Sequence, residues 1–260
     1  IGCSISNNVA STVNTGGGGG GINIDASPMI IVKTSITGNT GGGVFTCCDA
    51  DVSLDRGTVS NNTSSAIEGT NNYAGGIFLS GDHPVTFSIS NSIIWDNGTT
   101  DLSFNDVINN QIHTLTIKYS NIAGGQNSIL ENGHTLNWGS GNMDADPLFA
   151  DPANDNYTLQ WGSPAIDAGD PDLDGDGSDY TTDTDDQDPD GTRMDMGAYY
   201  FNQNDTIPPD LYISSLSSTN VGTEDSITVF WEVGLDVGLD TALIELLYTD
   251  TTILVDIMDP

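Results

Sequence analysis

The first 125 residues of the chain repeat one local pattern, in which a Gly-rich stretch precedes a short strand-like run and a later run ends in a turn that contains Asn. The Gly-rich stretches end at Gly21, Gly43 and Gly76, and the turns contain Asn39, Asn62 and Asn97. Equivalent points recur after about 21 to about 35 residues, which is the scale of one coil in a parallel β-helix. The pattern therefore predicts a solenoid in which each coil buries its apolar residues by stacking on the next.

Apolar and polar residues alternate within the strand-like runs, and almost no segment has a helical period. The clearest alternations are 22–24, 52–54, 85–89 and 115–117. A period of two predicts strands with one buried face. We expect about three short strands per coil, with Asn and Gly in turns that need left-handed backbone. Asn can also hydrogen-bond its counterpart one coil along, so its abundance is interpreted as structural.

The segment from Asp170 to Asp190 is the most acidic part of the chain. Ten of its 21 residues are Asp, and none is basic. Mutual repulsion prevents such a segment from staying compact at neutral pH unless a cation neutralises it. Ca²⁺ binds about six to eight oxygen ligands, which closely spaced carboxylates supply. The alternative is a disordered, solvated acidic linker.

The spacing of the Asp residues favours calcium over the linker. Positions 1, 3, 5 and 6 of an EF-type loop correspond to Asp172, Asp174, Asp176 and Gly177. Position 12 is Asp183, where a longer Glu is usual, and no helical pattern flanks the loop. We therefore predict a calcium loop without an EF-hand. The expected Ca²⁺ ligands are Asp170, Asp172, Asp174, Asp176, Asp179, Asp183 and Asp185.

The overall charge restricts the partners of the protein. The formal net charge is −33, and the only basic residues apart from His are Lys33, Arg56, Lys118 and Arg193. Such a chain repels nucleic-acid phosphates and anionic membrane surfaces, so cations and polymers bridged by cations are the expected partners. No apolar run approaches the roughly 18 residues that span a bilayer, which excludes membrane insertion. Because the chain starts with Ile1, we expect it to be a mature or excised piece of a longer protein.

Two ordered motifs near the end of the coils resemble a known family. Residues 146–172 read DPLFADPANDNYTLQWGSPAIDAGDPD, and residues 188–201 read DPDGTRMDMGAYYF. They resemble the C-terminal end of secreted bacterial right-handed parallel β-helix proteins of the choice-of-anchor Q type. The resemblance covers about residues 143–201, and it implies a right-handed β-helix in a secreted or cell-surface protein. In that family the last coils lead to a surface-anchoring region, whereas this chain continues into a new unit.

The expected fold class is all-β: a right-handed parallel β-helix followed by an immunoglobulin-like β-sandwich module. We assign coils to residues 1–142, the last coils with an Asp-rich calcium-binding cap to 143–201, a linker to 202–209 and the sandwich to 210–260. Pro208 and Pro209 mark the last boundary. The sandwich strands are expected at 211–213, 226–231, 241–248 and 253–255. These are fewer than the usual seven, so the module is incomplete or reduced.

The favoured function is a non-catalytic scaffold or adhesin, located outside the cell or on its surface, stabilised by calcium and binding glycans or other surface polymers. One alternative is a subunit of an extracellular fibre formed by self-association. The other is a polysaccharide-degrading enzyme, since parallel β-helices also host lyases and hydrolases. A uronate lyase needs basic groups, and a hydrolase needs two carboxylates about 5 to 10 Å apart. The candidates are Lys33, Arg56, Lys118, His83 and His113 for a lyase, scattered one to a coil, and Asp49, Asp51 and Asp55 for a hydrolase.

The cysteines and Arg193 carry structural expectations. Three cysteines, Cys3, Cys47 and Cys48, cannot form a complete disulfide framework. Cys3 bridges to one of the adjacent pair if coil stacking brings them together; otherwise all three are buried free thiols. Arg193, which lies just after the acidic segment, is expected to pair with Asp and to close the last coil.

Four other side chains are interpreted as structural. His83 and His134 lie in turns and are expected to be solvated rather than metal ligands, because no second His or Cys stands at a ligand spacing. Trp95 and Tyr119 lie beside turn residues, where they could stack on sugar rings, but aromatic residues in strands more often complete the core.

Overall fold

The computed structural model describes residues 3–10, 20–64, 74–98, 100–105, 109–129 and 131–204. It also describes the backbone of four strands at 211–216, 229–233, 244–248 and 251–255. The chain divides into two compact units, Ile1–Asn202 and Gln203–Pro260. The described residues contain no α-helix, and none of their helical turns is long and apolar enough to cross a membrane.

Fourteen strands of the first unit form three parallel sheets. They are β1 (Cys3–Ser6), β2 (Ile22–Asp25), β3 (Pro28–Val32), β4 (Thr34–Thr37), β5 (Val44–Cys47), β6 (Asp51–Asp55), β7 (Thr58–Ser60), β8 (Ile77–Leu79), β9 (Thr86–Ser90), β10 (Ile93–Trp95), β11 (Leu102–Phe104), β12 (Thr114–Lys118), β13 (Asn121–Ile122) and β14 (Thr135–Trp138). The sheet orders are β1-β4-β7-β10-β13, β11-β8-β5-β2 and β14-β12-β9-β6-β3. Each run of three successive strands, such as β5, β6 and β7, therefore forms one coil.

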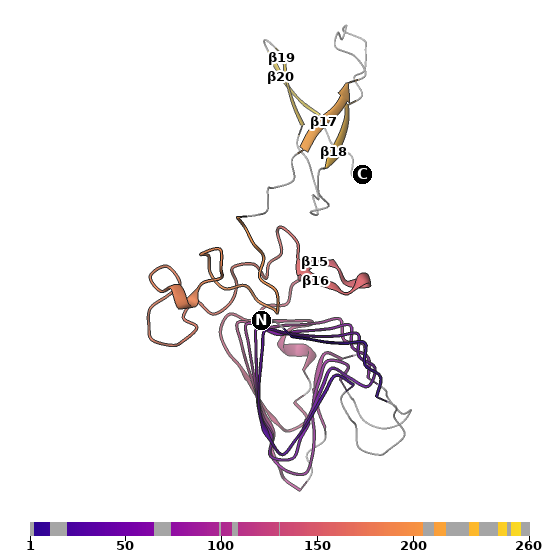
Figure 1. Ribbon diagram of the computed structural model, residues 1–260, viewed down its shortest axis with the longest axis vertical. Helices are drawn as coiled ribbons and strands as arrows, with labels where there is room; N and C mark the ends of the chain where they lie inside the picture. Colours follow the sequence, from indigo (N-terminus) through magenta and orange to yellow (C-terminus); the bar gives the residue numbers. More distant parts are fainter. Residues whose placement is uncertain are drawn as a thin grey trace. The chain divides into compact units, whose positions relative to one another are not determined.

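The coils stack as superimposed three-sided loops (Figure 1). All pairings within the three sheets are parallel, and the register is continuous from coil to coil. This confirms the predicted all-β stack of parallel strands and is compatible with a β-helix. The alternating segments at 22–24, 52–54 and 115–117 lie within β2, β6 and β12 as expected.

Apolar side chains form ladders inside the coils. Val52, Phe87 and Leu115 are one ladder, and Leu54, Ile89 and Ile117 are the next. Each of these six side chains is at most 1% exposed. Burying a side chain of this size contributes roughly 1.5–3 kcal/mol, which makes the ladders the main source of stability.

The glycines before β2 and β5 are required because successive coils approach closely there. A Cβ on Gly21 would lie 2.6 Å from the carbonyl oxygen of Gly43, and a Cβ on Gly43 would lie 2.8 Å from that of Gly76. These carbonyls accept hydrogen bonds from the coil before, as in the 2.8 Å bond from the Ile22 N–H to Gly43. Any larger residue would therefore push two coils apart.

The predicted Asn ladder is confirmed at the turn after the first sheet. The side-chain oxygen of Asn39 accepts the Nδ2–H of Asn8 at 2.9 Å, that of Asn62 accepts from Asn39 at 2.9 Å, and that of Asn97 accepts from Asn62 at 2.8 Å. Asn39, Asn62 and Asn97 are fully buried. Each oxygen also accepts the backbone N–H of the preceding ladder residue, so the ladder pairs buried main-chain groups.

Asp101 ends this ladder, since its Oδ1 accepts both the backbone N–H and the Nδ2–H of Asn97, at 3.0 and 2.8 Å. Burial raises the pKa of Asp101. An acid with a raised folded-state pKa stabilises the fold at low pH, and this contribution is lost as the pH rises through that pKa.

Asp101→Asn keeps the acceptor and removes the charge. We expect the variant to gain about 1 kcal/mol of unfolding free energy at pH 8 and less at pH 4, measured by thermal melting; an unchanged or lower stability at pH 8 would contradict the ladder account.

A second corner, between the third and first sheets, places large residues in left-handed backbone. Lys33, Arg56, Asn91 and Tyr119 occupy the same place in successive coils with φ of 48°, 50°, 50° and 45°. Only Asn adopts this conformation readily, so the other three are strained positions. Ser92, next in the chain, links the coils: its hydroxyl accepts the N–H of Gly57 at 2.9 Å and donates to Ser90 at 2.6 Å.

The structure corrects both expectations for the cysteines. Cys3 lies in β1 opposite Thr34 of the first sheet, whereas Cys47 ends β5 of the second sheet, so stacking does not bring them together. All three cysteines are free, and none is buried: Cys3 is exposed, and Cys47 and Cys48 are half-buried. The sequence could not assign the cysteines to sheets because the first coil lacks a complete repeat.

Parallel stacking ends near Met143, which forms an isolated bridge to Asn121. Beyond it, β15 (Phe149–Asp151) and β16 (Asn156–Leu159) pair antiparallel. Short 3-10 turns are η1 (Gln126–Ser128), which precedes Met143, and η2 (Pro152–Asn154) and η3 (Thr184–Asp186), which follow it. Residues 160–201 fold back onto the coils as irregular chain. Their apolar residues, including Ala165, Met196 and Phe201, form a second core with Ile93 and Leu159.

The second unit contains two antiparallel strand pairs. β17 (Leu211–Leu216) pairs with β18 (Val229–Val233), and β19 (Ile244–Tyr248) pairs with β20 (Thr251–Val255). The expected strands at 211–213 and 253–255 lie within β17 and β20. Residues 226–228 and 241–243 and the boundary prolines lie outside the described residues. The immunoglobulin-like assignment stays a prediction.

Candidate metal centre

The acidic segment starts at a point that is tied firmly to the coils. The Asp170 N–H donates to the side-chain oxygen of Asn91 at 2.6 Å, and the Asp170 carboxylate pairs with the Lys118 ammonium at 2.7 Å. The N–H of Gly169 donates to the Met194 carbonyl at 2.7 Å, which joins the two ends of the segment. The acidic loop therefore projects from an ordered base, unlike a solvated linker.

Within the loop, carboxylates bind the backbone N–H groups that follow them. Asp174 Oδ1 accepts the N–H of Asp176 at 3.0 Å, and Asp172 Oδ2 accepts the N–H of Gly177 at 3.2 Å. Gly175 and Gly177 have φ of 78° and 92°, which a residue with a side chain rarely adopts. The glycines and Asx-type turns thus fold the acidic residues into a compact loop.

This loop gathers carboxylates into two groups that share Asp174. The Asp172 cluster consists of Asp172, Asp174 and Asp186, and the Asp183 cluster consists of Asp174, Asp176 and Asp183. Within each cluster, one carboxylate oxygen per residue lies within 4.8 Å of the others. Carboxylates at this separation repel one another strongly unless a cation lies between them.

Two oxygen atoms in the Asp172 cluster lack hydrogen-bond partners although they are buried. They are Oδ1 of Asp172 and Oδ2 of Asp186. Asp186 is fully buried, and its other oxygen accepts the N–H of Leu173 at 2.5 Å. Burial raises the pKa of Asp186, and the nearby charges of Asp183 and Asp174 raise it further. A buried carboxylate with a free oxygen beside two other acids fits the oxygen ligand set of a hard divalent cation.

The structure brings together four of the seven predicted ligands: Asp172, Asp174, Asp176 and Asp183. The other three lie outside both clusters. Asp170 binds Lys118, Asp179 accepts the N–H of Thr181 at 3.0 Å, and Asp185 is exposed and donates its N–H to Asp183 at 2.9 Å.

Asp186 was missed by the sequence reasoning. It lies beyond position 12 of the loop pattern, and its neighbour Asp185 fits the alternate spacing as well. Only the 3-10 turn η3, capped by Asp183, turns Asp186 inward and leaves Asp185 outside.

Arg193 closes the last coil in a different way from the expected ion pair. Its guanidinium donates to the backbone carbonyl oxygens of Gly169, at 2.7 Å from Nε, and of Ala168, at 3.4 Å. It also lies over the Tyr119 ring, 5.9 Å from the centroid. The carbonyls attract Arg193 because the chain before the acidic segment leaves them without strand partners.

The basic residues that were candidates for a lyase are spread over the coils, and two of them form ion pairs with Asp. Lys118 pairs with Asp170, and Arg56 pairs with Asp55 at 2.8 Å. Lys33 and Arg56 line a cleft of about 480 Å³ together with Asp188 and Asp195.

Asp188 and Asp195, which line this cleft, accept hydrogen bonds from backbone N–H groups on either side of the acidic segment. Oδ2 of Asp188 accepts the N–H of Asp195 at 2.7 Å, and Asp195 accepts those of Asp167 and Phe201 at 2.7 and 2.6 Å. Desolvation raises the pKa of Asp188 to about 6 and that of Asp195 to about 7. Their role in the structure is to bind main-chain donors.

The histidines are structural as well. His113 is fully buried and stacks on His134 with ring centroids 4.4 Å apart, and desolvation lowers the pKa of His113 to about 4. The prediction that His134 is solvated is wrong, because the turn after Gly133 points the ring into the coil, where it is 5% exposed. His83 is exposed as expected and pairs with Asp82 at 2.9 Å.

The hydrolase candidates are far apart or engaged. Asp51 and Asp55 begin and end β6, so strand geometry separates them by about 13 Å, beyond the range for a pair of catalytic carboxylates. Asp55 accepts hydrogen bonds from Arg56, Ser90 and Asn91. Asp49 is exposed in the turn before β6.

Trp95 packs against the second core, as predicted, but part of its ring lines another cleft. This Trp95 cleft has a volume of about 470 Å³ and is lined by Ser60, Asn61, Trp95, Asp96, Asp146, Leu148, Phe149, Pro152, Ala153 and Gln160. An aromatic ring beside amide and carboxylate groups is a typical combination for binding a sugar.

No family model matches the sequence, and no curated protein or solved structure shows significant similarity to it. The resemblance to choice-of-anchor Q proteins therefore stays a prediction from the quoted motifs.

Proposed function

We propose that the protein is a non-catalytic scaffold or adhesin of the cell surface or extracellular space, and that calcium stabilises its acidic segment. In this proposal the coils are right-handed, and the second unit belongs to an immunoglobulin-like module. The supporting features are the ladder-built coils, the acidic loop anchored to them by Asp170, and a net charge of −33 that needs cations.

The observation that carries the proposal is the pair of buried, unpartnered oxygens of Asp172 and Asp186. Buried carboxylate oxygens without partners destabilise a fold, and a cation that binds both of them removes this penalty. Asp172, Asp174 and Asp186 would provide the protein ligands, and the ion would supply charge neutralisation and rigidity, not chemistry. Calcium sites in extracellular modules need only about 10⁻⁴–10⁻³ M affinity.

Calorimetric titration of Ca²⁺ into the 260-residue chain tests the metal site. We expect saturable binding with a Kd of about 10⁻⁴ M or tighter at low salt. Mg²⁺ should bind more weakly, because it demands near-octahedral geometry and loses its water reluctantly. Heats that are small, unsaturable and equal for the two ions would indicate diffuse screening and contradict the proposal.

The Trp95 cleft supports glycan binding within this proposal. Its half-buried ring and the nearby side chains of Asn61 and Gln160 suit neutral sugars, which the negative charge of the chain does not repel. We expect Trp95→Leu to weaken binding on an array of neutral oligosaccharides about tenfold, since it removes the ring but keeps an apolar side chain. Tyr200→Ala, at an exposed tyrosine outside this cleft, should bind normally. Binding that is absent, or equal in both variants, would contradict this assignment.

Two alternatives are distinguished by the same protein sample. Release of oligosaccharide products would support an enzyme, with the Lys33 and Arg56 cleft as its location. Elongated assemblies in negative-stain microscopy would support a fibre, which is favoured by the exposed apolar residues Met29, Ile30 and Val32 on the edge strand β3.

A further inference from the structure

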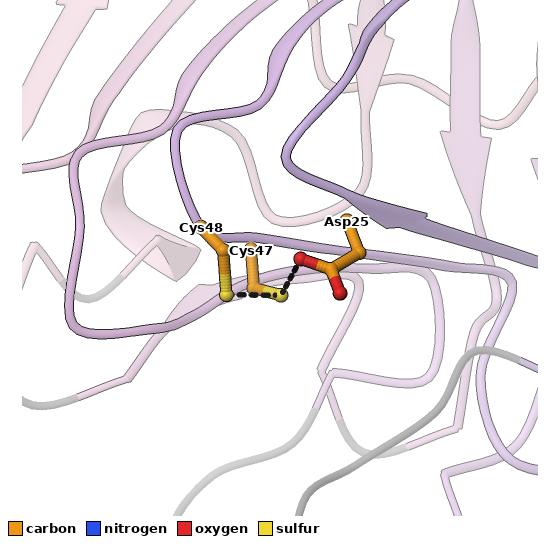
Figure 2. Close-up of side chains that lie close together, drawn as sticks. All are labelled: Asp25, Cys47 and Cys48. Carbon is orange, nitrogen blue, oxygen red and sulfur yellow. Dashed lines mark hydrogen bonds between the residues drawn. The ribbon is translucent and has the colours of Figure 1, made fainter.

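The corner that follows β5 holds two adjacent cysteines with their sulfurs in contact. Cys47 ends β5, and the chain then turns through Cys48 and Asp49, whose φ values are 63° and 64°. The two Sγ atoms lie 2.7 Å apart, and Oδ1 of Asp25 lies 3.6 Å from the Cys47 sulfur (Figure 2). Two consecutive left-handed residues other than Gly are a strained turn that the surrounding structure must maintain.

The coils on either side maintain this turn. From the coil before, the N–H of Ala26 donates to the Cys47 carbonyl at 3.3 Å. From the coil after, Gly81 packs on the pair: a Cβ there would lie 3.1 Å from both the Cβ of Cys47 and the N of Cys48. The stacking therefore holds the backbone of the turn on both sides of the pair, and this backbone keeps the two sulfurs adjacent.

A metal ion fits this pair less well than a covalent bond does. Asp25, Cys47 and Cys48 are close enough to be considered as ligands. However, two thiolates on one tetrahedral zinc, with Zn–S bonds of about 2.3 Å, have sulfurs about 3.8 Å apart. The observed separation of 2.7 Å is nearer to the roughly 2.0 Å of a disulfide.

We propose that Cys47 and Cys48 form a reversible vicinal disulfide, made by exchange with a small-molecule disulfide. The Cys48 thiolate attacks one sulfur of the small disulfide, forms a mixed disulfide and releases one thiolate. The Cys47 thiol then loses its proton, and its sulfur attacks the Cys48 sulfur and expels the second thiolate. The two cysteines lose two electrons and two protons, and the small disulfide becomes two thiols.

The order of these steps follows from the surroundings of the two thiols. Partial burial raises the pKa of Cys47, and Cys48 and the Asp25 carboxylate raise it further. Cys47 is thus the poorer first nucleophile and acts second, when the reaction is intramolecular. Closure fixes the corner between β5 and β6 and leaves Cys3, which lies in a different sheet, as the remaining thiol.

The positions of Lys33 and Arg56 make the test direct. Trypsin releases Thr34–Arg56 as one peptide that contains Cys47 and Cys48, while Cys3 is in a separate peptide. The reduced full-length chain is incubated with oxidised glutathione, free thiols are blocked with N-ethylmaleimide, and peptides are weighed by mass spectrometry. We expect the Thr34–Arg56 peptide to carry no N-ethylmaleimide and to be lighter by two hydrogens than the reduced peptide. After reduction with dithiothreitol, N-ethylmaleimide should modify both of its thiols.

The other outcomes overturn the proposal. Blocking of both thiols, stable glutathione adducts on the peptide, or a cross-link to the Cys3 peptide would each show that the pair does not close. Protection from N-ethylmaleimide by Zn²⁺ that EDTA reverses, without closure by oxidised glutathione, would assign a metal site instead. Cys48→Ser serves as control: its Cys47 should be blocked or glutathionylated without loss of the two hydrogens.

Discussion

Asn62→Ala is expected to lower the unfolding free energy of the coils by about 4 kcal/mol. Asn62 is fully buried, and its side chain accepts two hydrogen bonds from Asn39 and donates to Asn97 and to the carbonyl of Ile36. Alanine leaves several of these groups buried without partners, at about 1–3 kcal/mol each, in a space too small for water to replace them all. Urea unfolding followed by circular dichroism measures the loss.

Asn23→Ala is the matched control for this prediction. Asn23 lies in β2 of the same stack, but its side chain is exposed, so its replacement should change the unfolding free energy by less than about 0.5 kcal/mol. Equal effects of the two substitutions would mean that the Asn ladder does not hold the coils together.

Asp186→Asn is expected to abolish about half or more of the calcium-dependent stabilisation. At a calcium concentration about 100 times Kd, ion binding should raise the Tm of the wild type by roughly 8 °C over the value in EDTA. The Asn variant has one charged ligand fewer, so its Kd should rise at least about tenfold. In EDTA the order reverses: the variant should melt at or above the wild type, because it no longer buries an uncompensated charge.

Asp185→Asn provides a control, and it also tests whether the ligands are those in the structure or those that the sequence pattern predicts. The sequence favours Asp185 as a ligand, whereas the structure exposes it and buries its neighbour. Asp185→Asn should keep the full calcium-dependent rise in Tm. The opposite result, in which Asp185→Asn loses the rise in Tm and Asp186→Asn keeps it, would make Asp185 the ligand. That result would contradict the Asp172 cluster.

The coil body was predictable because its physics is local and repeated. The period of two marks β2, β6 and β12, and the Asn residues recur where successive turns stack. Each coil needs the same residue types at the same places, so a wrong assignment of one coil does not change the predicted architecture. The side-chain ladder from Asn8 to Asn97 follows directly from that repetition.

The contacts of residues 143–201 were less predictable because they join parts of the chain that are far apart. Nothing near Asp170 indicates that it meets Lys118 and Asn91, and nothing near Arg193 indicates a backbone partner. The same holds for the buried stack of His113 and His134, whose surroundings are set by neighbouring coils. The Asp spacing located the candidate site, but only the folded loop selects Asp186 as a member.

The most direct test of the calcium proposal is a crystal structure of the chain grown with millimolar CaCl₂, with an anomalous difference map calculated at a long X-ray wavelength. We expect an anomalous peak about 2.3–2.6 Å from Asp172 Oδ1 and Asp186 Oδ2, with Asp174 and water completing the oxygen ligands. No peak at these carboxylates, or an acidic loop without defined density at this calcium concentration, would contradict it.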